Sequence, residues 1–184
     1  MNQTVLRYTG TAIALHWLLA ALVITAFGLG LTMIEMPGIT PTKLKMFNYH
    51  KWLGVTIFGL AVLRLLWRLF HPAPPPPPSM PLWQRRVASI THWLLYALIF
   101  AIPLSGYFYS LAAGFPVVYL GLVPLPVLIE PDDQLKEVLK QTHFVLNTTL
   151  CTLVIIHVGA ALKHHFINRD DVLRRMLPRF KSRN

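Results

Sequence analysis

The sequence predicts an all-α membrane protein, a bundle of four transmembrane helices that forms one domain over residues 1–184. Of the 184 residues, 54% are hydrophobic and only 13% are charged, a composition that soluble domains of this size rarely have. Four apolar runs are each long enough to cross a bilayer as a helix. The segments between these runs are too short to hold a separate soluble domain.

The first predicted span covers about residues 11–34 and contains no charged side chain. It carries His16 near its start. The short apolar core and small-residue cleavage site of a secretory signal are missing, so we expect this segment to remain in the membrane as a helix.

The second predicted span covers about residues 46–69 and has basic residues at both ends. His50 and Lys51 lie at its start, and Arg64 and Arg68 lie near its end. The apolar core between them is short, but Lys and Arg side chains can extend along it so that their charged groups reach water.

The third predicted span covers about residues 87–110, after a proline-rich connector at 71–81 that cannot continue a helix. His92 lies near the start of this span, and Pro103 is expected to kink it. The following stretch, 111–128, is apolar but broken by glycine and proline. We expect a non-spanning loop at the membrane interface there, with a re-entrant segment as the alternative.

The fourth predicted span covers about residues 141–166, on a helix that begins near Asp132. It contains His143 and His157, and His164 follows near its end. Fourteen residues at about 100° each bring His157 to within roughly 40° of His143 and about 21 Å along the axis. Two imidazoles therefore face the same way at two depths, and such groups inside a membrane span are usually functional.

The distribution of basic residues predicts that both termini lie in the cytoplasm. With the N-terminus inside, the outer loops carry five lysines balanced by five acidic residues. The inner segments then carry an excess of basic residues, namely Arg7, Arg64, Arg68, Arg85, Arg86 and seven from Lys163 onward. The positive-inside rule favours this orientation. Because topology explains the net charge of +10, no nucleic-acid partner is predicted.

This topology places the histidines in two level pairs. His50 and His143 lie near the outer surface, and His16 and His157 lie near the inner surface. Two histidines on facing helices can bind one haem iron from both sides and leave no open position. The chain has no CxxCH motif for covalent attachment, so the pattern predicts two b-type haems that pass single electrons.

Other interpretations of these polar residues stay open. A zinc site would require more ligands at one depth, and a proton or metal transporter usually carries an acidic residue within a span, which none of the four has. His92 reaches a depth similar to that of His16 and is its rival as inner ligand, or a hydrogen-bond donor to a haem propionate. His164 is a candidate for contact with a quinone head group or a propionate. Basic side chains at the bundle ends are candidates to pair with propionates: Arg64, Arg68 and Lys51.

Four motifs resemble those of the bacterial cytochrome b561 family over nearly the whole chain. They are IALHWLLA, NYHKWLG, ITHWLLYALIFAIPLSGY and THFVLNTTLCTLVIIHVGAALKHHF, one from each span. The resemblance implies a four-helix bacterial inner-membrane protein with two b haems, whose ligands come from the first, second and fourth helices. Carried over to this sequence, these ligands are His16, His50, His143 and His157.

The resemblance also implies quinone as a redox partner. One branch of the family is reported to oxidise superoxide at the periplasmic face and to reduce ubiquinone, and this sequence is similar to that branch in being a short, stand-alone chain. The preferred hypothesis is therefore a membrane oxidoreductase that moves electrons from a periplasmic one-electron donor, with superoxide as the candidate, to ubiquinone. The alternative is a haem-b membrane anchor that conducts electrons for a separate soluble dehydrogenase as its redox partner.

Overall fold

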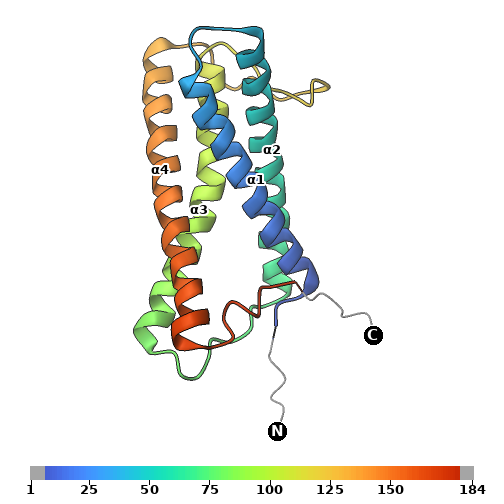
Figure 1. Ribbon diagram of the computed structural model, residues 1–184. Coiled ribbons are helices and arrows are strands. Elements are labelled where there is room, and N and C mark those ends of the chain that lie inside the picture. Colours follow the sequence, from blue (N-terminus) through green and yellow to red (C-terminus); the bar gives the residue numbers. More distant parts are fainter. Residues whose placement is uncertain (1–6, 179–184) are drawn as a thin grey trace, which may run out of the picture.

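A computed structural model describes residues 7–178 and consists mainly of four long helices (Figure 1). The helices are α1 (Gly10–Glu35), α2 (Pro41–Phe70), α3 (Leu82–Ala112) and α4 (Asp133–Lys163), and a short π-helix, η1 (His164–Asn168), continues α4. All four are long and apolar enough to cross a membrane. The predicted all-α, four-span fold is therefore confirmed.

The helices run alternately up and down and pack mainly against their neighbours in sequence. The principal contacts join α1 with α2, α2 with α3, and α3 with α4. The start of α1 and the end of η1 lie at the same end of the bundle (Figure 1). A C-terminal segment, residues 169–178, returns from η1 towards α1, where Met176 O accepts a hydrogen bond from Trp17 Nε1 at 2.9 Å and Leu177 O accepts one from the Arg7 guanidinium.

Many large apolar side chains on the helices are exposed at the surface of the bundle. Ile24 on α1, Leu69 on α2 and Ile155 on α4 are each more than 60% exposed. A soluble bundle would bury such residues, whereas a membrane protein presents them to lipid. The exposed apolar surface is therefore the surface of a multi-pass membrane protein.

Helix α2 begins at Pro41, earlier than the predicted start near residue 46. Thr40 supplies the reason, because its Oγ1 accepts a hydrogen bond from Lys43 N at 3.1 Å. Proline at the first helical position needs no N–H partner, so this cap starts the helix before the apolar core.

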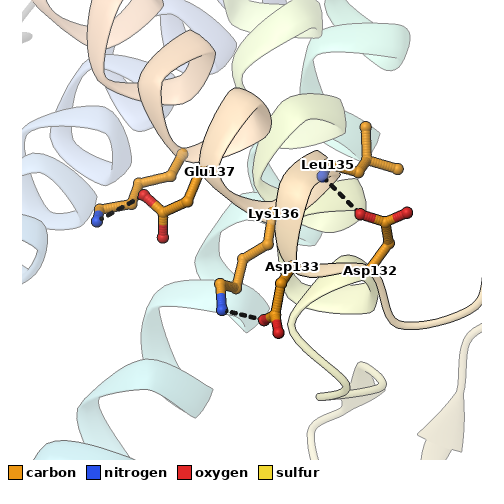
Figure 2. Close-up of polar contacts among 6 residues, drawn as sticks. Asp132, Asp133, Leu135, Lys136 and Glu137 are labelled. Carbon is orange, nitrogen blue, oxygen red and sulfur yellow. Dashed lines mark hydrogen bonds and ion pairs between the residues drawn. The ribbon is translucent and has the colours of Figure 1, made fainter.

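Helix α4 begins at Asp133, in agreement with the start near Asp132 that the sequence indicated, and Figure 2 shows its first turns. Asp132 caps the helix by accepting a hydrogen bond from Leu135 N at 2.8 Å. Two ion pairs follow on successive turns, Asp133 with Lys136 at 2.5 Å and Glu137 with Lys140 at 3.2 Å. Charged pairs at this spacing stabilise a helix in water. The helix therefore begins with two polar turns that precede the apolar part predicted to cross the membrane.

Helix α3 begins at Leu82, directly after the proline-rich connector, rather than at residue 87. Arg85 fixes the junction by donating from Nε to Met80 O at 2.8 Å and from Nη2 to the carbonyls of Pro77 and Pro78. Pro103 lies inside α3, as the sequence indicated.

The long connection between α3 and α4 contains no helix, in agreement with the predicted non-spanning loop. It holds a small antiparallel hairpin of β1 (Val118–Tyr119) and β2 (Val123–Pro124), which the sequence did not predict. The hairpin lies against α2 and projects sideways from the bundle (Figure 1).

The bundle geometry places both described ends of the chain on one side, but the side of the membrane stays a prediction. Three of the basic residues that favour a cytoplasmic location, Arg179, Lys181 and Arg183, lie outside the described residues.

Candidate functional site

Two histidine pairs lie inside the bundle at two levels. His50 of α2 faces His143 of α4, with ring centroids 6.3 Å apart. His16 of α1 faces His157 of α4, also with ring centroids 6.3 Å apart. The structure thus brings together both pairs that the sequence predicted by depth.

The common separation fits a metal ion between the two rings of each pair. An imidazole nitrogen binds a transition metal at about 2.0–2.1 Å, and the ring centre lies about 1.1 Å behind that nitrogen. Two imidazoles on opposite sides of one iron therefore have centres about 6.3 Å apart. Each observed pair has the spacing of a six-coordinate haem iron with two histidine ligands.

Ser105 of α3 sets the tautomer of His143. Its hydroxyl donates to Ile102 O at 2.8 Å, so its oxygen is left to accept the hydrogen bond from His143 Nδ1 at 2.9 Å. A proton on Nδ1 leaves the lone pair of Nε2 available to a metal, and partners of this kind orient histidine ligands in metal sites. The polar environment of His143 therefore suits a ligand.

Gly106, the next residue of α3, makes room for the same imidazole. A Cβ atom at this position would lie 3.0 Å from His143 Cε1 and 3.3 Å from its Nδ1. Ordinary contacts between carbon atoms are about 3.5–4.0 Å, so only glycine lets the ring lie this close to α3.

His50 is enclosed as well, and its ring lies near the backbone of Ala26 on α1. A Cβ atom at Gly30 of α1 would lie 3.6 Å from His50 Cε1, an ordinary contact distance. The Nδ1 atom of His50 is buried and makes no hydrogen bond within the described part of the chain. Buried polar atoms usually have a partner, and one without a partner is often found where a ligand binds.

His92 lies beside the inner pair rather than across from it. Its ring centroid is 5.3 Å from that of His157, compared with 6.3 Å between His16 and His157. The shorter distance leaves too little room for an iron with a normal bond to each ring. Trp17 lies edge-on to His16, with ring centroids 5.3 Å apart. The geometry favours His16 over its rival as the partner of His157.

Arg64 ties three helices together next to the inner pair. From α2 it donates through Nη1 to Ala12 O of α1 at 2.9 Å and through Nε to the Tyr96 hydroxyl of α3 at 3.1 Å. Ala12 lies one turn before His16 on α1, so the guanidinium lies close to the inner pair. Arg68, one turn further along α2, lies over the Tyr96 ring, 5.6 Å from the ring centroid.

Lys51, the cation predicted for the outer pair, lies half-buried next to His50 on α2. It makes no hydrogen bond or ion pair with residues 7–178, so its ammonium group has no protein partner there. The two levels therefore differ. An arginine that donates hydrogen bonds to two other helices lies beside the inner pair, whereas a lysine without a partner among residues 7–178 lies near the outer pair.

His164 belongs to a separate polar cluster beyond the inner pair. Its Nδ1 lies 2.5 Å from Asp170 Oδ2 and 3.2 Å from Asn168 Nδ2. The two paired side chains are 14% and 15% exposed. They border a cavity of about 340 Å³ whose lining also includes Ser79 of the connector and Gln84 of α3.

Three residues with a part in these sites were not predicted as such: Ser105, Tyr96 and Asp170. The hydroxyl group of Ser105 lies in an apolar span, where it needs a hydrogen-bond partner, so the sequence did contain a signal for this residue. Tyr96 lies one turn after His92 and on the same face. Asp170 lies in a predominantly basic tail, and nothing in its sequence context indicates the contact with His164.

Comparison with known proteins gives matches over almost the entire chain. A sequence profile described as prokaryotic cytochrome b561 matches residues 7–179. Cytochrome b561 homolog 2 of Escherichia coli (strain K12) is 36% identical over 176 residues, which cover 96% of this chain and 94% of that protein. Cytochrome b561 homolog 1 of the same organism is 32% identical over 179 residues, covering 95% and 99% of the two chains. The probable superoxide oxidase CybB of Yersinia pestis is 30% identical over 175 residues, covering 94% and 97%.

Proposed function

The chain belongs to the prokaryotic cytochrome b561 family of membrane electron-transfer proteins that bind haem b, and from this premise we propose that it carries single electrons between two haems. The observation that supports two haems is the equal 6.3 Å separation of two histidine pairs at two levels of the bundle. His50 and His143 would hold one haem, and His16 and His157 the other. Iron with two histidine ligands supplies one-electron redox chemistry and has no open position.

The neighbouring side chains would support these ligands. Ser105 accepts the hydrogen bond from His143 Nδ1 and so holds the proton on that nitrogen. Gly106 lets the imidazole of His143 lie against α3. Arg64 would place a fixed positive charge beside the inner haem, where it favours the reduced form. Arg68 and Lys51 remain candidates to pair with propionates, and His92 would border the inner haem without binding its iron.

The proposed direction of electron flow follows from topology. With both termini in the cytoplasm of a bacterium, the pair His50–His143 lies towards the periplasm of the inner membrane. Basic residues at that end, including Lys43 and Lys51, would attract an anionic donor. Superoxide is such a donor, and the relative from Yersinia pestis is named a probable superoxide oxidase. Each superoxide that gives up one electron leaves as oxygen.

Ubiquinone is the proposed acceptor at the inner end. Two electrons that arrive one at a time, together with two protons, convert the quinone to a quinol. His164 lies seven residues beyond His157 and pairs with Asp170, at the end of the bundle where these protons would enter. A histidine paired with a carboxylate can donate a hydrogen bond to a quinone carbonyl and exchange protons. His164 is therefore the candidate for the quinone head group, and Arg68 lies towards the same end of the bundle.

The first test is a reduced-minus-oxidised spectrum of the purified protein with haem counted per chain. We expect two b haems in the parent protein and one in each of the variants His50→Ala and His157→Ala. His92→Ala should retain both. Loss of the inner haem in His92→Ala but not in His16→Ala would show that the inner pairing is wrong, and a protein without haem would reject the proposal.

A second test distinguishes an enzyme from an electron conduit. The purified protein alone, in liposomes with ubiquinone, is exposed to a superoxide source while haem reduction and quinol formation are followed. Haem reduction by superoxide followed by quinol formation supports the proposed reaction. Haems that remain oxidised until a separate dehydrogenase is added would favour the role of membrane anchor and conduit.

A further inference from the structure

The hairpin between α3 and α4 carries an unusual concentration of exposed apolar side chains. No residue from Leu111 to Ile129 is charged. At the tip, Leu120 is 53% exposed, Leu122 is 80% exposed and Val123 is 54% exposed. A loop that projects into water would be expected to carry polar residues at such positions.

The backbone of the tip strengthens this observation. Leu120 has φ of 54° and Gly121 has φ of 72°, the left-handed conformation needed at both central positions of a tight hairpin turn. Glycine adopts it freely, but the first position in such turns usually holds Asn, Asp or Gly, because a leucine there is strained. An apolar side chain is thus kept at the tip at an energetic cost.

The hairpin is held at a defined level of α2. Trp52 Nε1 donates to Val118 O at 2.7 Å, and the Tyr119 hydroxyl lies 3.0 Å from Thr56 Oγ1. Trp52 directly follows Lys51, the last charge before an uncharged run that continues to Leu63. The hairpin therefore lies where the apolar part of α2 begins, at the edge of the hydrocarbon layer.

Several backbone N–H groups of the hairpin are satisfied within the segment itself. Gly121 N, Leu122 N and Leu125 N each donate to a carbonyl within the segment, at 3.2, 3.0 and 2.9 Å. Pro116, Pro124 and Pro126 have no N–H to satisfy. Transfer of this backbone into a poorly hydrated environment therefore costs less than for an ordinary loop.

We propose that this hairpin is a membrane anchor whose leucine tip inserts into the acyl chains of the leaflet at the His50 end of the bundle. Lipid is the chosen occupant because the hairpin is bonded to α2 where the apolar part of that helix begins, and its exposed tip carries only apolar side chains and no charge. The anchor would fix the height of α2, and with it the depth of His50 below the membrane surface. This inference depends on the exposed residues and not on any cofactor.

The test uses spin labels in the full-length protein, reconstituted in phosphatidylethanolamine and phosphatidylglycerol liposomes. In a Cys151→Ser background, Leu122→Cys is labelled, and collision rates with oxygen and with a water-soluble nickel chelate are measured. Val123→Cys gives a second reading of the tip if the first variant folds poorly. Matched controls are Ile155→Cys, 67% exposed in the apolar part of α4, and Val138→Cys, 57% exposed among its charged first turns.

We expect the tip labels to behave like the label at 155, with high collision rates for oxygen and low rates for the chelate. Labels that behave like the one at 138 would place the tip in water and overturn the proposal. Labels that are immobilised and shielded from both reagents would show that protein, such as a second copy of the chain, covers the tip, which also overturns it.

Discussion

Gly106→Ala should weaken the outer haem selectively. The added Cβ would lie 3.0 Å from His143 Cε1 and 3.3 Å from Nδ1. Helix α3 cannot retreat easily, because the hydrogen bond from His143 to the neighbouring Ser105 holds the ring against the same turn. The imidazole must therefore shift away from α3, towards the position of the iron.

The cost can be estimated from similar additions to packed interiors. One extra methyl group forced into a packed site costs about 1–3 kcal/mol. At about 1.4 kcal/mol for each factor of ten, haem affinity at the outer site should fall by roughly 5- to 150-fold. The inner site, about 21 Å further along α4, should be unaffected.

The assay is stepwise haem titration of the haem-free protein, with the two sites separated by their absorption spectra and by the variants His50→Ala and His157→Ala. Gly59→Ala is the matched control, because a Cβ atom there has no neighbour within 4 Å. Replacement of a helical glycine by alanine otherwise stabilises by roughly 0.5–1 kcal/mol. Equal outer-site affinity in the two variants would refute the reasoning from close contact.

Three further predictions concern single contacts. Ser105→Ala should lower haem affinity at the outer site by about 10- to 100-fold, because His143 Nδ1 loses its hydrogen-bond acceptor. Ser105→Thr retains a hydroxyl and should recover part of this loss in the same titration. Equal losses in the two variants would contradict the prediction. Arg64→Gln should lower the reduction potential of the inner haem alone, since a cation beside a haem favours the ferrous form; a redox titration in which both potentials move equally would reject this explanation. Trp17→Phe keeps an aromatic ring next to His16 but removes the bond to Met176 O, so limited proteolysis should cut within 169–178 faster, and an unchanged rate would show that the bond does not hold the segment.

The sequence predicted the histidine pairs because two simple regularities act together. Helical periodicity placed His143 and His157 on one face, and alternating span direction matched each with a residue of equal depth. The start of α2 was predicted less well, because hydropathy detects the apolar core and misses the capped polar turn around Thr40. The start of α4 was predicted from its capping residue, Asp132, rather than from hydropathy.

Contacts between distant segments could not be predicted. The sequence offered Arg64 as a propionate partner, but the bonds to Ala12 O and to Tyr96 depend on how three helices pack. The pair of His164 and Asp170 requires the chain to reverse after η1, where Arg169 adopts a left-handed conformation with φ of 53°. Neither periodicity nor composition contains this information.

The C-terminal segment, residues 169–178, connects the end of α4 and η1 back to α1. Each helix packs mainly against the next one in sequence, so α1 and α4 are linked through three successive interfaces. The inner pair has one histidine on α1 and one on α4, so small shifts at these three interfaces would all change the distance between its two rings. Residues 169–178 add a direct link between the two helices. They follow η1, donate a hydrogen bond from Arg175 to Pro75 O, and accept one at Met176 O from Trp17 of α1. The distance between His16 and His157 is then fixed from both directions. A fusion partner that pulls this segment away should broaden the spectrum of the inner haem and leave the outer one sharp.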